Sequence, residues 1–399
     1  MRLAAGVATA LIAATAPAAN AQEAGIELIV DPEPIEAEAT GMPGIYVQPS
    51  VPEQFRENSG AAGILAQGWS MLGREDLGAK AGSDEYQPRR CKALAGGATG
   101  AQNVLDAIAA RAVDARVVII NESHEVIRHR DFSRQIIERL RPLGYTVFAA
   151  ETFQNLTDKP DPVEESAELL YPRSKDGYYL REPVFGELVR TAKRLGFRLA
   201  AYEQPFVPAS ERPTGIDAQI ASREQSQAEN LAALLATMGP QEKLVVHVGY
   251  SHAREIETKR KDGFDTSWMG ARLKRMTGID LLTIAQTKCI GSAEQVRLAQ
   301  APEANVRWFD MFVDHPVTTF EHGRSAWRFG NGYEAVDLPA EFQAAGEPLI
   351  IEAFAANEPF EAVPVDRVWV SPGEDVKLAL KTGRYRVRAV RPTIVPGAD

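Results

Sequence analysis

Glutamate and histidine side chains follow four apolar stretches of this sequence. Glu122 and His124 come after the first stretch, Glu151 after the second, Glu203 after the third and His252 after the fourth. Carboxylates and imidazoles that converge can set one another's pKa so that one acts as a general base. They can also hold a divalent metal that lowers the pKa of a bound water. Both arrangements point to hydrolysis.

The four stretches have the composition of buried strands. Residues 117–120 are continuous in Val and Ile, which is typical of a parallel strand covered on both faces. Further strands are predicted at 145–150, 197–202, 243–248 and 281–285, and helical spacing of apolar residues predicts helices near 132–140, 183–195, 217–238 and 268–276. The alternation predicts an α/β fold with a mostly parallel sheet covered by helices on both faces.

In an open parallel sheet, ligands bind outside the carboxyl ends of the strands. Glu122, His124, Glu151 and His252 are therefore the predicted catalytic residues, or metal ligands if the chemistry depends on a metal. Glu203 and Tyr250, which follow strands at the same edge, are predicted supporting residues, whereas His247 lies inside a strand and is assigned to the core. His129 is expected to form a surface pair with Glu125 on the following helix, and His315 and His322 carry no spacing signal.

The chain divides into four predicted regions. Residues 1–21 have the charge, apolar run and small-residue site of a signal peptide. Residues 22–90 are predicted to be a Pro-rich, largely disordered linker, residues 91–300 an α/β domain, and residues 301–399 a β-rich extension with a hairpin across Thr382 and Gly383. We therefore expect a periplasmic or extracellular protein with no stable membrane insertion after signal cleavage.

The net charge and the cysteines of the chain bear on its partners and its cellular compartment. The 399 residues include 44 Lys and Arg against 54 Asp and Glu, a formal net charge of −10, which argues against a nucleic-acid partner. Cys91 and Cys289 are the two cysteines, and in an oxidising compartment they could form one disulfide. The sequence does not establish that bond.

A competing motif lies directly after the fourth strand. Residues 249–253 read Gly-Tyr-Ser-His-Ala, which is close to the GxSxG nucleophile elbow of α/β-hydrolases. Asp310 and His322 follow in the chain order that those enzymes use. The sequence contains no GxxxxGK phosphate loop, and no GxGxxG follows the first strand, so nucleotide binding lacks support.

The strand ends resemble those of a known superfamily. Residues 120–125 (Ile-Asn-Glu-Ser-His-Glu) and 148–151 (Phe-Ala-Ala-Glu) look like the opening of the erythromycin esterase / ChaN / TIKI (haem-binding uptake, TraB-like) superfamily. Residues 223–230 are similar to its Arg-containing helix that ends in Asn, and 246–253 to its later strand that ends in His-Ala. The resemblance covers roughly 115–287 and adds Arg223 as a supporting residue. Asn121 departs from it, because a Gly is expected before Glu122.

The resemblance implies a secreted hydrolase that acts on an ester, lactone or amide of a small-molecule or peptide substrate. His124 or His252 would deprotonate a water with help from Glu122 and Glu151, or the same residues would bind Mn, Co or Zn. The alternative that it implies is a non-enzymatic periplasmic protein that binds haem or iron through Tyr202, Tyr250 or His252.

Overall fold

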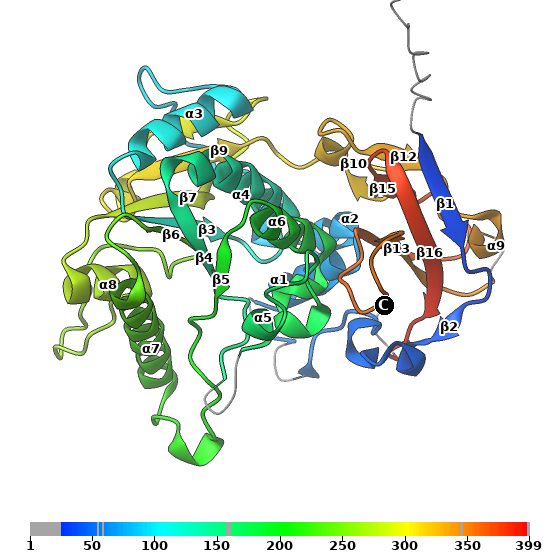
Figure 1. Cartoon of the computed structure of the whole chain (residues 1–399), viewed down its shortest axis with the longest axis horizontal. Helices are drawn as coiled ribbons and strands as arrows, with labels where there is room; N and C mark the ends of the chain where they lie inside the picture. The colour runs from blue at the N-terminus through cyan, green and yellow to red at the C-terminus, as the bar shows by residue number, and fades with distance from the viewer. Residues whose placement is uncertain (1–24, 54–55, 58–59, 157–160, 344–345, 397–399) are drawn as a thin grey trace, which may run out of the picture.

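The central element of the computed structural model is a seven-stranded sheet of order β5-β4-β6-β3-β7-β9-β8 (Figure 1). The structure describes residues 25–396 except 54–55, 58–59, 157–160 and 344–345, so the predicted signal peptide lies outside the described residues. The strands of this sheet are β3 (Val117–Glu122), β4 (Tyr145–Ala150), β5 (Arg198–Ala200), β6 (Lys243–Gly249), β7 (Leu281–Ile290), β8 (Arg297–Ala299) and β9 (Met311–His315). Neighbours from β5 to β9 pair in parallel, and β8 pairs with β9 antiparallel.

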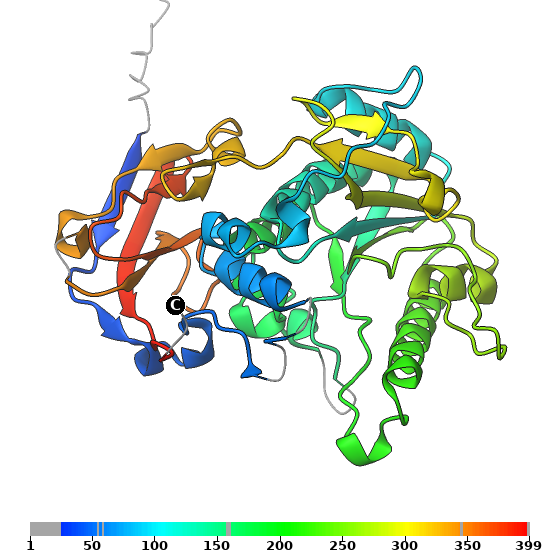
Figure 2. The same ribbon diagram turned by 180° about the vertical axis from the view of Figure 1, so that it is seen from behind.

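Helices cover both faces of the sheet (Figures 1 and 2). Helices α3 (Ala101–Ala112), α4 (Ile127–Leu140) and α6 (Pro183–Arg194) share one core with Val118 and Ile120 of β3. Helices α7 (Ile216–Thr237) and α8 (Met269–Thr277) share the other core with Val117 and Ile119. Alternate residues of β3 thus enter opposite cores, which is why the strand is apolar throughout up to Asn121.

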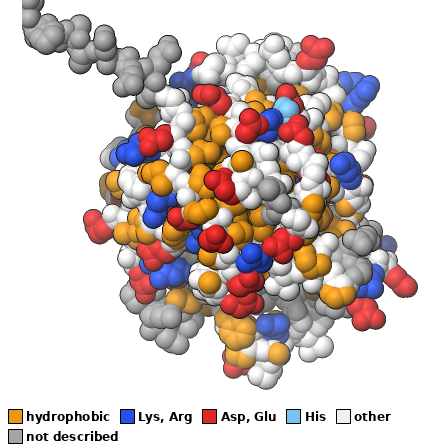
Figure 3. All heavy atoms as spheres, turned by 90° about the vertical axis from the view of Figure 1, so that its right-hand side faces the viewer, with side chains coloured by type: hydrophobic (Ala, Val, Ile, Leu, Met, Phe, Trp, Pro, Cys, Tyr) orange, Lys and Arg blue, Asp and Glu red, His pale blue; other side chains and the backbone are white. Residues whose placement is uncertain are grey.

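A second sheet is built from both ends of the described chain. Its strands are β1 (Ile26–Val30), β13 (Leu349–Ala355), β14 (Asp366–Val370) and β16 (Gly383–Arg391), and the short β2 (Ile35–Glu36) also pairs with β16. Strand β1 runs parallel to β16, and β13 runs antiparallel to β16 and β14. Figure 3 views the molecule from the side on which β1 and β2 lie, where hydrophobic and charged side chains are interspersed.

The prediction of a largely disordered linker at 22–90 is wrong for the described residues. This region contains β1, β2, α1 (Ala61–Met71) and α2 (Glu75–Lys80), and Figure 2 shows the two helices between the two sheets. Ile26, Leu28 and Val30 alternate along β1 and pack against the core of the second sheet. This two-residue period is typical of a half-buried strand, and the prolines that follow it do not interrupt it.

The predicted hairpin across Thr382 and Gly383 is also wrong. Strand β15 (Leu378–Leu380) pairs with β12 (Glu334–Val336), whereas β16 pairs with β13 and β1. The remaining pair is β10 (Phe320–Glu321) with β11 (Arg324–Ser325), and a short helix, α9 (Ala340–Gln343), follows β12. The α/β class is confirmed, but the sheets of the chain mix parallel and antiparallel pairs rather than being mostly parallel throughout.

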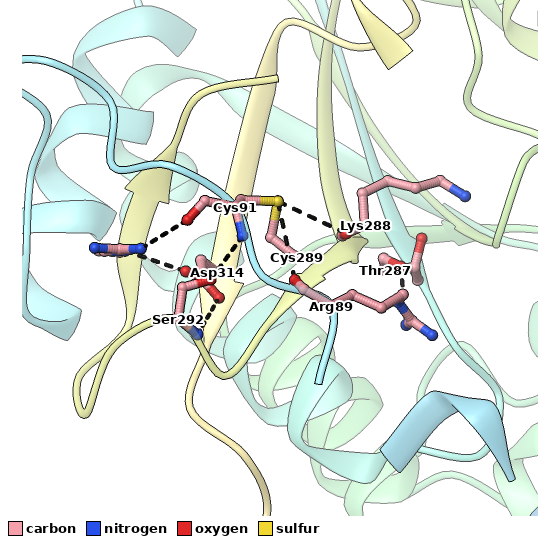
Figure 4. The surroundings of a disulfide bond; sticks show 8 residues. Arg89, Cys91, Thr287, Lys288, Cys289, Ser292 and Asp314 are labelled. Atoms are coloured by element: carbon pink, nitrogen blue, oxygen red, sulfur yellow. Dashed lines mark hydrogen bonds and ion pairs between the residues drawn. A yellow bond between two sulfur atoms is a disulfide. The ribbon is translucent and has the colours of Figure 1, made fainter. Parts of the chain in front are cut away.

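A disulfide joins Cys91 to Cys289 and ties the segment before α3 to strand β7 (Figure 4). The peptide nitrogen of Cys91 donates to Ser292, and Arg297 donates both to the carbonyl of Cys91 and to Asp314. The covalent link therefore holds the segment before α3 against an interior strand of the sheet. None of the helices in the described ranges is both long and apolar enough to cross a bilayer.

Candidate functional site

The carboxyl ends of β3, β6 and β4 lie side by side and bring the predicted residues to one edge of the sheet. Glu122 ends β3, and Glu151 directly follows β4. The backbone joins these ends, because the amide of Tyr250 donates to the carbonyl of Glu122 (2.7 Å) and that of Glu151 to the carbonyl of His247 (3.0 Å). Two histidine–carboxylate clusters occupy this edge, one around His124 and one around His252.

The first cluster fixes the imidazole of His124. Its Nδ1 lies 2.8 Å from Oε1 of Glu122, and the same carboxylate accepts two hydrogen bonds from Arg130 of α4. Burial opposes the charge of Glu122, but the charge of Arg130, the hydrogen bond with His124 and the proximity of His247 outweigh burial and hold the pKa of this carboxyl far below its usual range. Glu122 is therefore an anion that orients His124 and leaves Nε2 free of that contact.

The second cluster favours the charged form of His252. Its Nδ1 lies 2.7 Å from Oε1 of Glu224 on α7, and its Nε2 lies 3.7 Å from Oε1 of Glu151. Burial lowers the pKa of this imidazole, but the negative charges of Glu151 and Glu224 outweigh burial and raise it above the ordinary value. His252 is therefore more readily protonated than a histidine in water.

Arg223 of α7 joins the acidic residues of the second cluster. Its Nη2 donates to both Glu151 and Glu203, and its Nη1 lies 3.4 Å from Nε2 of His252. Burial opposes the charge of Glu151, but His252, His124 and Arg223 lower the pKa of Glu151 to about 2, and the amide of Gly249 also donates to this carboxylate. The site thus holds an ionised carboxylate between two imidazoles.

Aromatic rings and a glycine define the space around His124. The ring of Tyr179 stacks on the imidazole with centroids 4.0 Å apart, and the ring of Tyr250 meets it edge-on at 5.0 Å. A Cβ on Gly249 would lie 2.5 Å from Nε2 of His124 and 3.1 Å from Oε2 of Glu151, so only glycine fits there. Tyr250 has a φ of 41°, a strained backbone conformation of the kind that clusters at functional sites.

A cavity of about 770 Å³ opens onto this edge, and its walls include Glu151, Tyr179 and Arg223. Its volume is in the range of small-molecule sites. Lys175 and Arg181 also line it, and the Arg181 guanidinium lies 4.8 Å from the ring of Tyr178. The rim of the cavity therefore combines positive charge with aromatic surface.

The predicted metal site is not formed. No group of three or more His, Cys, Asp or Glu side chains in the described ranges is arranged to hold a metal ion. The physical reason is that arginines occupy the carboxylates: Arg130 binds Glu122, and Arg223 binds Glu151. Guanidinium groups take the oxygen lone pairs and supply the positive charge that a divalent ion would otherwise supply.

Two further interpretations of histidines are corrected. His129 is 1% exposed and accepts a hydrogen bond from the amide of Ser123 (3.0 Å), so it is a core residue and not part of a surface pair. The serine-hydrolase alternative does not assemble, because His322 contacts Asp375 (2.9 Å) and Asp310 accepts from the amide of Thr283 (3.0 Å). His247 is a core residue as expected, at 1% exposed.

Sequence reasoning missed three residues of the site: Arg130, Tyr179 and Glu224. Each lies on a helix or in a segment that leads into one, whereas the predicted residues lie at the ends of strands. The sequence did contain a signal for Arg130. Glu122 ends a buried strand, so its carboxylate needs a nearby cation, and Arg130 follows one turn into α4. Tyr179 carried none.

Comparisons with known proteins return toxin structures at low similarity. Neither a family model nor a curated protein matches the chain. Similar solved structures include RRSP, a MARTX toxin effector domain from Vibrio vulnificus CMCP6 (TM-score 0.36, 17% identity, 62% of this chain and 47% of that one). Others are the type III effector HopBA1 (0.35, 14%, 58% and 99%) and the C-terminal region of Pasteurella multocida toxin (0.33, 14%, 55% and 28%).

These findings overturn the predicted family. The similar structures described here are bacterial toxins and effectors and not members of the erythromycin esterase / ChaN / TIKI superfamily, and no family model supports that membership. The esterase-type and haem-binding functions that rested on the resemblance fall with it. The quoted motifs are only four to eight residues long, and short polar motifs recur at strand ends in unrelated α/β folds because ligand sites form there. At these TM-scores and identities, the toxin structures carry no argument about the chemistry of this chain.

Proposed function

We propose that the chain is an enzyme that uses general acid–base catalysis with two imidazoles, His124 as the base and His252 as the acid. The observation that carries the proposal is the placement of one ionised carboxylate, Glu151, between a histidine with an orienting Glu122 and a second histidine whose pKa is raised. Two imidazoles that flank one site and have different hydrogen-bond partners can serve as its base and its acid.

His124 has the features of the base. Glu122 holds Nδ1 as the donor in this contact, which places the lone pair on Nε2, next to Gly249 and Glu151. A proton taken up at Nε2 is stabilised by the negative charge of Glu122, as an aspartate stabilises the imidazolium of a catalytic triad. The proton passes from the substrate to Nε2, and His252 returns a proton to the substrate; exchange with solvent then restores both imidazoles.

The cavity supports a substrate with negative charge and an apolar or aromatic group. Lys175 is exposed, and neither Lys175 nor Arg181 has a carboxylate partner among the described residues. Tyr178 and Phe206 contribute aromatic surface to the same walls. An anionic group at the rim would place the rest of a small substrate against Tyr179, next to His124.

Acylation by diethyl pyrocarbonate, which attacks unprotonated imidazole nitrogens, tests the assignment. The side chains of His124 and His252 are equally exposed, at 11%, so a difference in rate reports protonation and not access. We expect His252, whose pKa is raised, to react at least about tenfold more slowly than His124 at pH 7, and Glu224→Gln to speed the reaction of His252 because that negative charge no longer favours its protonated form. Glu138→Gln on the exposed face of α4 is the control, and exposed His322 is the internal reference. Equal rates at the two histidines would contradict the proposal.

A further inference from the structure

A second cavity, of about 830 Å³, lies away from the acid–base site and next to β9. Its walls come from α4, from the β7–β8 connection and from the segment around β9, β10 and β11; they include Arg128, Phe132, His315, Val317 and Trp327. No residue that lines it also lines the cavity at Glu151. It is therefore a separate space with its own chemistry.

Arg128 is the arginine of α4 whose charge is not neutralised. Arg130 pairs with Glu122 and Glu182, Arg134 with Asp131 and Glu138, and Arg139 with Asp106. Arg128 has no such ion pair among the described residues and donates only to the carbonyl of Pro316 (2.7 Å).

The surroundings of Arg128 disfavour its charge in the absence of an anion. Burial lowers the pKa of Arg128 to about 10, although Glu75 and Asp131 counteract part of that effect. Asp131, which lines the same cavity, is engaged by Arg134, Gln135 and Asn331. A partly buried guanidinium beside a cavity, with its neighbouring carboxylate already bound elsewhere, is a site that an anion would stabilise.

The other walls suit the body of an organic molecule. Phe132, Val296, Val317 and Trp327 supply apolar and aromatic surface, and the Arg128 guanidinium lies 5.8 Å from the Trp327 ring. The indole Nε1 of Trp327 is buried and has no hydrogen-bond partner within the described part of the chain. A buried donor without an acceptor costs stability unless a ligand or water accepts from it.

We propose that this cavity binds an organic anion whose carboxylate pairs with Arg128 and whose apolar or aromatic body packs against Trp327 and Phe132. The carboxylate offers four lone-pair positions, enough to accept from the planar guanidinium. The remaining volume accommodates an aromatic or short aliphatic group, as drug-sized pockets do. This site is independent of the proposed acid–base chemistry.

The test compares two probes of matched shape on the full chain, 4-phenylbutyrate and the neutral 4-phenylbutyramide, by isothermal titration. We expect the carboxylate to bind the wild type at least about tenfold more tightly than the amide, and Arg128→Gln to remove that preference while leaving amide binding unchanged. Arg139→Gln, on the exposed side of the same helix, is the matched control and should retain the preference.

Two further variants keep the proposal open to refutation. Trp327→Leu should weaken the binding of both probes by a similar factor and leave the ratio of their affinities unchanged. This measurement tests the proposal even if Arg128→Gln does not fold. Arg181→Gln alters the other cavity, so it removes any binding of the carboxylate probe there and should keep the preference that depends on Arg128. Equal affinities of the two probes for the wild type, or loss of the preference in Arg181→Gln with retention in Arg128→Gln, would overturn the proposal.

Discussion

Replacement of Arg130 by methionine is the most informative perturbation of the acid–base site. The side chain of Arg130 is fully buried and donates to Glu122 (2.8 and 3.0 Å), to Glu182 (3.2 Å) and to the carbonyl of His124 (3.1 Å). Methionine has an unbranched stem of similar length but no charge and no donors. The substitution therefore leaves two buried carboxylates without their cation.

Loss of one partner of a buried ion pair costs about 3–5 kcal/mol, because the remaining charge is uncompensated. We expect Arg130→Met to lower the free energy of unfolding by about that amount at pH 7. In the wild type, Glu122 has a folded-state pKa below its unfolded value, so its stabilisation is present above the unfolded pKa and is lost as pH falls through the folded one. In the variant, burial raises the pKa of Glu122, so the deficit should shrink as pH falls from 7 towards 5.

Urea unfolding of the wild type and three variants measures the differences in the free energy of unfolding. Arg130→Met with Glu122→Gln should recover at least about 1 kcal/mol of the loss, since the buried charge is gone. Arg139→Met is the control, because that arginine forms an exposed pair with Asp106 whose loss costs about 1 kcal/mol or less. A loss below about 1 kcal/mol in Arg130→Met, or a double variant less stable than Arg130→Met alone, would refute the view that Arg130 neutralises the site.

Three further outcomes follow from the same structure. Glu224→Gln should lower the pKa of His252 in an NMR titration. Because the pKa of His252 is raised in the folded state, its protonation stabilises the fold below the unfolded pKa, near 6.5. The variant should therefore be less stable than the wild type below that pH, and equally stable above the folded pKa. Gly249→Ala should displace His124 and shift its ring resonances, whereas Gly44→Ala, where a Cβ has open space, should not. Reduction of the disulfide, which spans 198 residues, should cost about 5 kcal/mol in the loop-entropy model, measured as the denaturation midpoint with and without reductant.

The sequence was sufficient for strands β3 to β7 of the main sheet and for their carboxyl edge, but not for β8 or for β9, which lies beyond the predicted domain boundary at residue 300. Continuous Val and Ile runs predicted β3 and β6, and the rule that ligands bind at the carboxyl ends of parallel strands predicted that Glu122, Glu151 and His252 converge. These predictions succeed because burial on both faces leaves a strong local signal. The catalytic role of the three residues stays a prediction.

The second sheet could not be predicted because its pairing is not local. Strand β1 finds its partner β16 more than 350 residues away, with Ile26 opposite Gly383 and Val30 opposite Val387. Nothing in either short segment specifies the other, so the prolines between residues 32 and 52 dominated the interpretation. Arg130, which neutralises Glu122, was missed because a charge on a helix is interpreted as solvated until the packing places it against a carboxylate.

Asn121 shows how a departure from an expected motif can be structural. A glycine was expected before Glu122, but the Asn121 side chain donates to the carbonyl of Tyr250 (2.7 Å) and accepts from the amide of Gln286 (2.7 Å). Glycine would leave these buried groups without that partner, at about 1–3 kcal/mol for each unsatisfied group. The contact also supports the strained backbone of Tyr250 next to His124. The same network continues through Gln286 to His315 (3.0 Å), which lines the second cavity. Asn121 thus connects the backbone of the acid–base site to the wall of the proposed anion site through paired polar groups, and this buried network is a physical reason for an amide side chain at this position.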